Sequence, residues 1–235
     1  MPAAYLAGEG SVLTVLFHGA LDRGRTRLPM FQRITSQRAM GIGPVLAFAD
    51  PTLDLSSALR LGWYLGTAEI DLPTVMAEIV RDVIARSGCD RVFLQGGSGG
   101  GFAAIATGIH VPGSVAVAFS PQTDVRAYSA TFVKECLAAA FPVGTFVGDG
   151  PPSARLSLMT RMETFGHIPQ IELITNSGDE FHLKGHAAPL IEYLAARDAD
   201  VLSVTEFDLG PGHRTPDNNA YYQIMRDIYA KHLTS

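Results

Sequence analysis

The chain has 235 residues, of which 47% are hydrophobic and 17% charged, a composition typical of a globular protein with a large buried core. Its net charge of −5 argues against nucleic acid as a partner, because phosphate binding needs a basic surface. The two cysteines are too few for a disulfide framework or a zinc site, so we expect small buried residues of a reduced, cytoplasmic protein. Neither a secretory leader nor a membrane-spanning apolar run is evident in the sequence.

Short apolar runs along the chain have the length and β-branched composition of strands. Near-continuous apolar runs are typical of strands buried on both faces, so they predict a mainly parallel sheet. The predicted strands cover Ser11–Phe17, Pro44–Ala49, Arg91–Gln95, Ser114–Phe119, Gln170–Thr175 and Val201–Phe207.

Segments with helical spacing separate these runs. In Leu72–Ser87 the apolar residues fall on one stripe, and Gly88 follows as a stop signal. The alternation predicts one α/β domain over residues 1–235, with a doubly wound, mainly parallel sheet of about six strands between flanking helices. The other predicted helices cover Ser98–Ile109, Lys184–Ala196 and Pro216–Leu233.

The connection between the fourth and fifth predicted strands, Pro121–Pro169, is too long for a simple crossover. Helical patterns at Val125–Ala140 and Arg155–Thr164 flank its Gly/Pro-rich centre, Phe141–Pro152. We therefore expect a small helical cap inserted at about residues 121–169, over the carboxyl edge of the sheet, where caps often act as lids.

A serine lies in a glycine-rich turn between a predicted strand and a predicted helix. The segment Gly96–Gly100 contains Gly-x-Ser-x-Gly with Ser98 at its centre. Such a tight turn leaves little space for neighbouring side chains, and it places the central residue at a helix N-terminus, where negative charge is favoured. The pattern in this context predicts that Ser98 is a nucleophile.

Two alternatives to a nucleophile remain. The first is a flexible turn with an incidental serine. The second is a dinucleotide-binding turn, because Gly99–Ala104 fits Gly-x-Gly-x-x-Ala and Asp124 follows about 20 residues later. That fingerprint normally opens the first strand–helix unit of its domain, whereas this turn follows the third predicted strand.

A nucleophilic serine needs a base, and the base needs an orienting carboxylate. Turns after the fifth and sixth predicted strands supply Asp179 and His213, each beside glycines. The chain order Ser98, Asp179, His213 suits a catalytic triad. Glu180 and Asp124 remain alternatives for the acid.

The remaining histidines have weaker contexts for a base. His182 follows the predicted acid too closely to reach the serine independently, and the others precede loops or fall in predicted helices: His110, His167, His186 and His232.

Acyl transfer also needs N–H donors for the developing oxyanion. The predicted donors are the backbone N–H groups of Gly99 and of Ala20, with Leu21 as the alternative to Ala20. The second donor lies in the loop after the first predicted strand, where a His-Gly pair such as His18-Gly19 is frequent. We expect His18 to brace this loop rather than to act as a base.

Together these features resemble the α/β-hydrolase superfamily across nearly the whole chain. Phe119–Asp124 and Ala58–Gly66 are similar to segments of small hydrolase-like proteins of bacteria. The resemblance implies the α/β-hydrolase fold and hydrolysis of a carboxylic ester or thioester through a covalent acyl-enzyme. The sequence departs from fuller members because no obvious pair of antiparallel strands precedes Ser11–Phe17, so we expect the sheet to be trimmed at its N-terminal edge. An acyltransferase with the same residues and a non-catalytic hydrolase-like binding or assembly protein are the alternatives.

Aromatic residues near predicted strand ends are candidates for binding the substrate: Trp63, Tyr64, Phe102 and Phe181. The expected substrate is a small-molecule or glycan-linked acyl ester. Acyl chemistry of this kind needs no cofactor, and no metal site is predicted. The sequence leaves the oligomeric state open.

Overall fold

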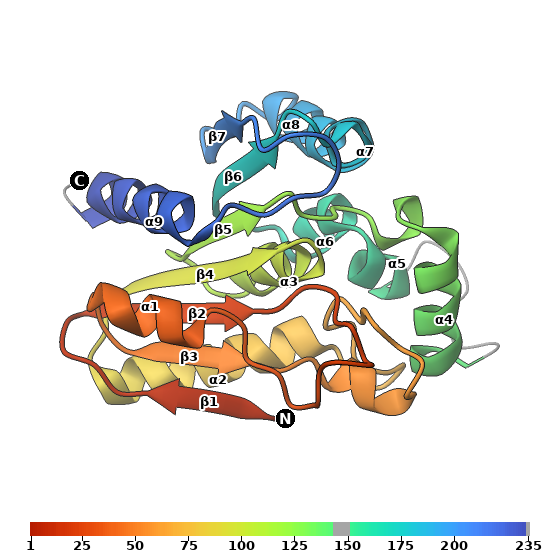
Figure 1. The fold of residues 1–235 in the computed structure, drawn as a ribbon, viewed down its shortest axis with the longest axis horizontal. Coiled ribbons are helices and arrows are strands. Elements are labelled where there is room, and N and C mark those ends of the chain that lie inside the picture. Colours follow the sequence, from red (N-terminus) through yellow and green to blue (C-terminus); the bar gives the residue numbers. More distant parts are fainter. Residues whose placement is uncertain (143–150, 234–235) are drawn as a thin grey trace.

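The structure is a computed structural model that describes residues 1–142 and 151–233. Within these residues seven strands form one sheet in the order β1-β3-β2-β4-β5-β6-β7 (Figure 1). All neighbouring strands are parallel except β1 and β3. The strands are β1 (Ala3–Leu6), β2 (Val12–Phe17), β3 (Val45–Phe48), β4 (Arg91–Gly97), β5 (Val115–Phe119), β6 (Gln170–Asn176) and β7 (Leu202–Phe207).

The sheet confirms the predicted α/β architecture. β2, β3 and β5 are buried at every position, as expected for strands covered on both faces. β1 has no comparable sequence signal, because its four residues only alternate between exposed and half-buried positions at the sheet edge. The sheet therefore has seven strands rather than about six, and one antiparallel edge strand precedes β2.

Helices cover both faces of this sheet (Figure 1). α2 (Leu72–Ser87), α3 (Gly99–Gly108) and α8 (Ala188–Ala195) pack on one face, while α1 (Ile34–Met40) and α9 (Asn218–Leu233) pack on the other. The helix predicted over Lys184–Ala196 is divided, because a wider turn, η3 (Leu183–Ala187), precedes α8. The shorter elements are η1 (Pro51–Leu55), η2 (Val125–Ala127), α4 (Ala130–Ala140), α5 (Pro151–Leu156), α6 (Leu158–Phe165), α7 (Glu180–His182) and η3 (Leu183–Ala187).

The segment between β5 and β6 carries η2, α4, α5 and α6, and α4 lies beyond the carboxyl ends of β2, β3 and β4 in Figure 1. Part of its predicted Gly/Pro-rich centre, residues 143–150, lies outside the described residues. Buried side chains of the segment, such as Cys136 and Leu158, share one apolar cluster with Trp63 and Phe102. The described helices of this segment are therefore packed into the core.

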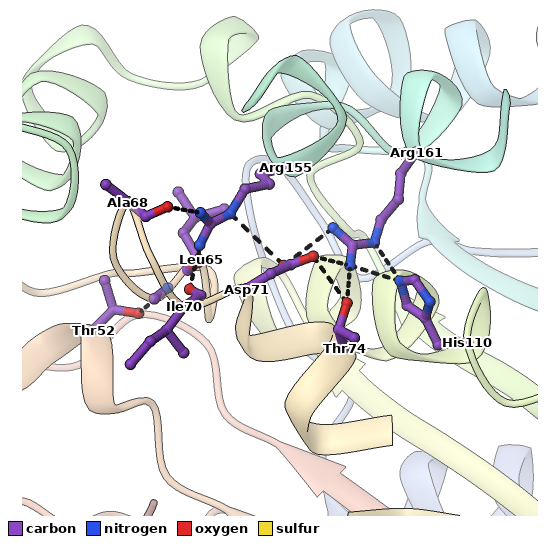
Figure 2. Close-up of polar contacts among 10 residues, drawn as sticks. Thr52, Leu65, Ala68, Ile70, Asp71, Thr74, His110, Arg155 and Arg161 are labelled. Atoms are coloured by element: carbon purple, nitrogen blue, oxygen red, sulfur yellow. Dashed lines mark hydrogen bonds and ion pairs between the residues drawn. The ribbon is translucent and has the colours of Figure 1, made fainter. Parts of the chain in front are cut away.

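Two buried arginines share one aspartate where α5 and α6 meet the start of α2 (Figure 2). Arg161, only 1% exposed, donates to Asp71 Oδ2 at 2.7 Å. Burial and this guanidinium lower the pKa of His110 to about 4, so its neutral imidazole accepts a hydrogen bond from Arg161. Arg155 lies 3.8 Å from the other Asp71 oxygen. It also donates to three backbone carbonyls, those of Leu65, Ala68 and Ile70.

Removing the negative charge from this network should destabilise the protein. In Asp71→Asn neither guanidinium is neutralised, and breaking a buried ion pair typically costs roughly 3–5 kcal/mol. We expect a decrease of that size in the free energy of unfolding measured in urea. Asp22→Asn, which removes an exposed ion pair with Arg25, is the control and should leave the midpoint unchanged. Equal midpoints for Asp71→Asn and wild type would contradict a stabilising role.

Two expectations about the whole chain concern cysteines and membranes. Cys89 and Cys136 are both free and buried, as expected for small core residues.

None of the helices in residues 1–142 and 151–233 combines the length and the apolar character needed to cross a bilayer.

Candidate active site

Ser98 occupies the sharp turn that joins β4 to α3. Its backbone has φ 56° and ψ −122°, a strained conformation for any residue with a side chain, and it caps the N-terminus of α3. The Ser98 N–H donates to the carbonyl of Phe119 at 2.9 Å, which ties the turn to β5. The residue is 9% exposed, at the carboxyl edge of the sheet. This is the geometry that the Gly-x-Ser-x-Gly pattern predicts for a nucleophile.

The glycines around Ser98 are required by close backbone contacts. A Cβ at Gly96 would lie 2.2 Å from the carbonyl oxygen of Gly100, and one at Gly100 would lie 2.6 Å from the carbonyl oxygen of Phe17. Any larger residue would force the strand and the helix apart. Close backbone packing therefore explains these glycines without a bound nucleotide.

The loop after β2 lies directly beside Ser98. A Cβ at Gly19 would lie 3.5 Å from the Cβ of Ser98. His18 Nε2 accepts from the N–H of Asp50 at 3.1 Å, so Nδ1 carries the proton and donates to the carbonyl of Gly19 at 2.8 Å. The Tyr64 hydroxyl accepts from the His18 N–H at 2.9 Å. The arrangement matches the bracing role expected of His18.

The backbone donors predicted for an oxyanion are placed at this loop and at the start of α3. Among the described residues, the N–H groups of Ala20 and Gly99 have no hydrogen-bond partner. The alternative donor, Leu21, is already used, because its N–H donates to the carbonyl of Arg60 at 2.8 Å. Of the two alternatives in the loop, Ala20 is therefore the available one.

Asp179 and His213 meet at the neighbouring strand ends. Asp179 caps α7 just after β6, and its Oδ2 lies 2.7 Å from Nδ1 of His213 in the loop after β7. Burial alone would raise the pKa of the Asp179 carboxyl. The hydrogen bonds from His182 and His213 outweigh burial, so this pKa lies below the ordinary aspartate value. Asp179 is thus an ionised carboxylate that orients an imidazole.

The two alternative acids are engaged elsewhere. Glu180 points to the surface and pairs with Lys184 at 2.6 Å, with both side chains more than three-quarters exposed. Asp124 pairs with Arg126 at 2.6 Å and caps η2. Neither carboxylate contacts a histidine through a hydrogen bond in the described part of the chain.

A buried glutamine that the sequence patterns do not single out contacts the serine. Gln122 follows β5 and is fully buried. Its Nε2 donates to Ser98 Oγ at 2.8 Å and lies 2.8 Å from Nε2 of His182. The indole N–H of Trp63 donates to Gln122 Oε1 at 3.1 Å. A polar residue in the loop that follows a buried strand, at the edge that holds Ser98, is the signal that could have identified Gln122.

His182 is also part of the site, although its spacing from Asp179 argued against it. One turn of α7 brings its Nδ1 to 2.8 Å from Asp179 Oδ2, off the line of an ideal hydrogen bond. Its ring stacks on that of His213, with centroids 4.0 Å apart and planes 19° apart. Burial, and then the His213 imidazole, lower the pKa of His182. His182 reaches Ser98 through Gln122 rather than directly.

Asp179, His182 and His213 are also the ligand types that a transition metal uses. Asp179 Oδ2 and one ring nitrogen of each histidine lie within 4.8 Å of one another. Nδ1 of His213 is hydrogen-bonded to the carboxylate and Nδ1 of His182 lies 2.8 Å from it, so imidazole–carboxylate contacts account for the cluster.

The four aromatic residues expected to bind substrate differ in how exposed they are at the site. Phe102 and Tyr64 are core residues with at most 1% exposure, so they do not line an open site. Trp63 is also fully buried and reaches the site only through its hydrogen bond to Gln122. Phe181 is 51% exposed, with its ring 5.3 Å from that of His182, so it alone of the four lies at the surface beside the site.

Comparison with solved structures identifies the architecture. The capsule O-acetyltransferase of Neisseria meningitidis serogroup A superposes with a TM-score of 0.64 at 15% identity, covering 99% of this chain and 91% of that chain. An α/β-hydrolase from the metagenome of Mar Chica lagoon sediments, Morocco, gives 0.56 at 15% identity, covering 97% and 95%. The chain has the α/β-hydrolase fold.

Another similar structure is that of an S-formylglutathione hydrolase from Agrobacterium tumefaciens. It superposes with a TM-score of 0.64 at 15% identity, covering 98% of this chain and 88% of that chain. A scan against protein-family models and a search of curated proteins found no match. At such identities the likeness establishes the fold, and the chemistry has to be argued from the site.

Proposed function

We propose that the protein is a serine-dependent acyl-transfer enzyme, and in the first place a carboxylester hydrolase. Ser98 is its nucleophile, His213 its base and Asp179 the carboxylate that orients the base. The observation that carries the proposal is the strained, glycine-flanked Ser98 at the same sheet edge as a hydrogen-bonded Asp179–His213 pair. The expected substrate is a small-molecule or glycan-linked acyl ester.

The proton transfer requires His213 Nε2 to approach Ser98 Oγ, and these atoms form no hydrogen bond in the described residues. The rings of His182 and His213 are nearly parallel, and both direct Nδ1 to Asp179 Oδ2. Asn176 Nδ2 donates to the carbonyls of Gly210 and Gly212 at 2.9 and 2.8 Å, so the approach has to come from His213 itself, beyond this anchor. Such contacts are often long in the absence of substrate.

In this proposal the reaction follows two acyl-transfer steps. Ser98 Oγ attacks the acyl carbon as its proton moves to His213, and the resulting oxyanion accepts hydrogen bonds from the N–H groups of Ala20 and Gly99. The alcohol then leaves with the proton from His213, and Ser98 holds the acyl group. Attack by water, assisted by His213, releases the acid and restores the serine.

Transfer of the acyl group to a hydroxyl acceptor is the second candidate function. It is favoured by the likeness to the capsule O-acetyltransferase, a variant of which was solved in complex with CoA and superposes on this chain with a TM-score of 0.67 at 16% identity. The two reactions share the acyl-enzyme and differ only in whether water or a hydroxyl group attacks it.

Covalent labelling tests the proposed nucleophile. A fluorophosphonate probe should label the wild-type protein, and mass spectrometry should locate the probe on the peptide that contains Ser98. Labelling that is absent, or that maps to another serine, would contradict the proposal and favour a non-catalytic binding protein. The probe experiment is paired with hydrolysis of p-nitrophenyl esters of increasing chain length, which measures the acyl preference.

Product analysis separates the hydrolase from the acyltransferase. The acylated protein is formed with an acetyl ester or acetyl-CoA and is then given water alone or a hydroxylated sugar. A hydrolase yields free acetate in both cases, whereas an acyltransferase yields an O-acetylated sugar when the sugar is present. Wild-type protein that is labelled at Ser98 but forms only free acetate would exclude the acyltransferase for that acceptor.

A further inference from the structure

The side chain in direct contact with the proposed nucleophile is an amide. Gln122 Nε2 lies 2.8 Å from both Ser98 Oγ and His182 Nε2. The orientation of this amide is fixed by chemistry, because the indole N–H of Trp63 can only donate and must face Gln122 Oε1. Both hydrogen atoms of the amide nitrogen are therefore used, one toward Ser98 and one toward His182.

We propose that Gln122 is a further catalytic residue, which donates to the nucleophile oxygen and holds His182 in the tautomer that leaves the serine proton to His213. The inference rests on the proposed function. Since His182 Nε2 accepts from Gln122, its lone pair is occupied and its proton lies on Nδ1, facing Asp179.

The donation to Ser98 stabilises charge on Oγ in both half-reactions. In acylation the O–H bond breaks, the proton moves to His213 Nε2, and an electron pair of Oγ forms the bond to the acyl carbon. In deacylation that bond breaks, its electron pair returns to Oγ, and the proton comes back from His213. Gln122 keeps both of its hydrogen atoms throughout, and the site is buried enough for the hydrogen bond to be strong.

The second donation accounts for why two imidazoles on one carboxylate do not compete for the serine proton. A protonated His182 would bring an N–H against the N–H of Gln122, and its charge would lie 4.0 Å from the His213 ring. Both contacts oppose protonation of His182, as burial does. His213, a third exposed, is the imidazole that is free to gain the proton.

Two variants of Gln122 test the inference. Gln122→Met removes both donors without adding charge, and Gln122→Glu keeps the shape and the acceptor for Trp63 but replaces the donors with a carboxylate oxygen. Because a hydrogen bond to a charged group contributes about 1.5–3 kcal/mol, we expect labelling by the fluorophosphonate probe to slow by about tenfold to a hundredfold in both variants. Gln170→Glu is the matched control, because it makes the same change at the amino end of β6, away from the carboxyl edge that holds Ser98. This variant should label at the wild-type rate.

A spectroscopic measurement separates this role from a structural one. Nuclear magnetic resonance of protein labelled with heavy-nitrogen histidine should show His182 as a neutral Nδ1–H imidazole in wild type at neutral pH. In Gln122→Glu the new carboxylate should draw a second proton onto His182. His182→Asn identifies the signal, and thermal melting confirms that each variant is folded.

The outcomes distinguish the inference from the proposed function. Wild-type protein that is labelled at Ser98, with folded Gln122→Met and Gln122→Glu labelled equally fast, would overturn the role of Gln122 and leave the proposed function standing. Wild-type protein that is not labelled overturns the proposed function and the donation to a nucleophile together. An Nε2–H tautomer of His182 in wild type would overturn the second half of the inference by itself.

Discussion

Replacing Ser98 with alanine is expected to lower kcat for ester hydrolysis by about 10⁴–10⁶-fold, because the proposed acyl intermediate forms on the Ser98 oxygen. Ser98 stands alone at the tip of the β4–α3 turn, and its neighbours there are glycines. The residual rate should reflect substrate binding and the backbone donors of Ala20 and Gly99 alone. The measurement is steady-state hydrolysis of a p-nitrophenyl ester, together with probe labelling.

A matched serine controls this experiment. Ser177 is exposed, in the turn that leads to Asp179, and its side chain has no role in the proposed reaction. Ser177→Ala should hydrolyse the ester at the wild-type rate. A Ser98→Ala protein that keeps a tenth or more of the wild-type kcat would show that the nucleophile is elsewhere.

The position of Ser98 could be predicted from the sequence, because glycines on both sides of a serine between a strand and a helix are typical of a nucleophile turn. Asp179 and His213 were predicted from chain order and from their turns at strand ends, and the structure brings the two into contact. Parallel strands make this inference possible, since their carboxyl ends all meet at one edge.

Gln122 and His182 were missed for a physical reason. Their roles depend on side-chain directions that no spacing rule encodes. His182 folds back because Asp179 caps a helix of a single turn, which a sequence pattern does not distinguish from a loop. Gln122 is recognisable only once Trp63, far away in sequence, is known to supply the donor that fixes its amide. Tyr64 and Phe102 illustrate the converse, since proximity to strand ends did not reveal that they are buried.

Replacing Asp179 with asparagine is expected to lower kcat by about 10⁴-fold while leaving the fold intact. In the wild type, Asp179 Oδ2 lies within 2.8 Å of Nδ1 of both His182 and His213. The backbone N–H of His182 donates to Asp179 Oδ1 at 3.3 Å, so the oxygen of the asparagine takes this position and its NH₂ group replaces Oδ2, facing both imidazoles. A ring that accepts from this NH₂ group must carry its own proton on Nε2.

The hydrogen bond from Gln122 to His182 decides which imidazole moves its proton in Asp179→Asn. His182 keeps its proton on Nδ1 because its Nε2 accepts from Gln122, so His213 is the ring that moves its proton to Nε2. A His213 that already carries a proton on Nε2 cannot take one from Ser98, and the base is lost. Glu180→Gln, an isosteric loss of an exposed carboxylate one residue away, should retain full activity. If Glu180→Gln instead lost activity and Asp179→Asn did not, the acid would be Glu180 and the proposed hydrogen-bond network would be wrong.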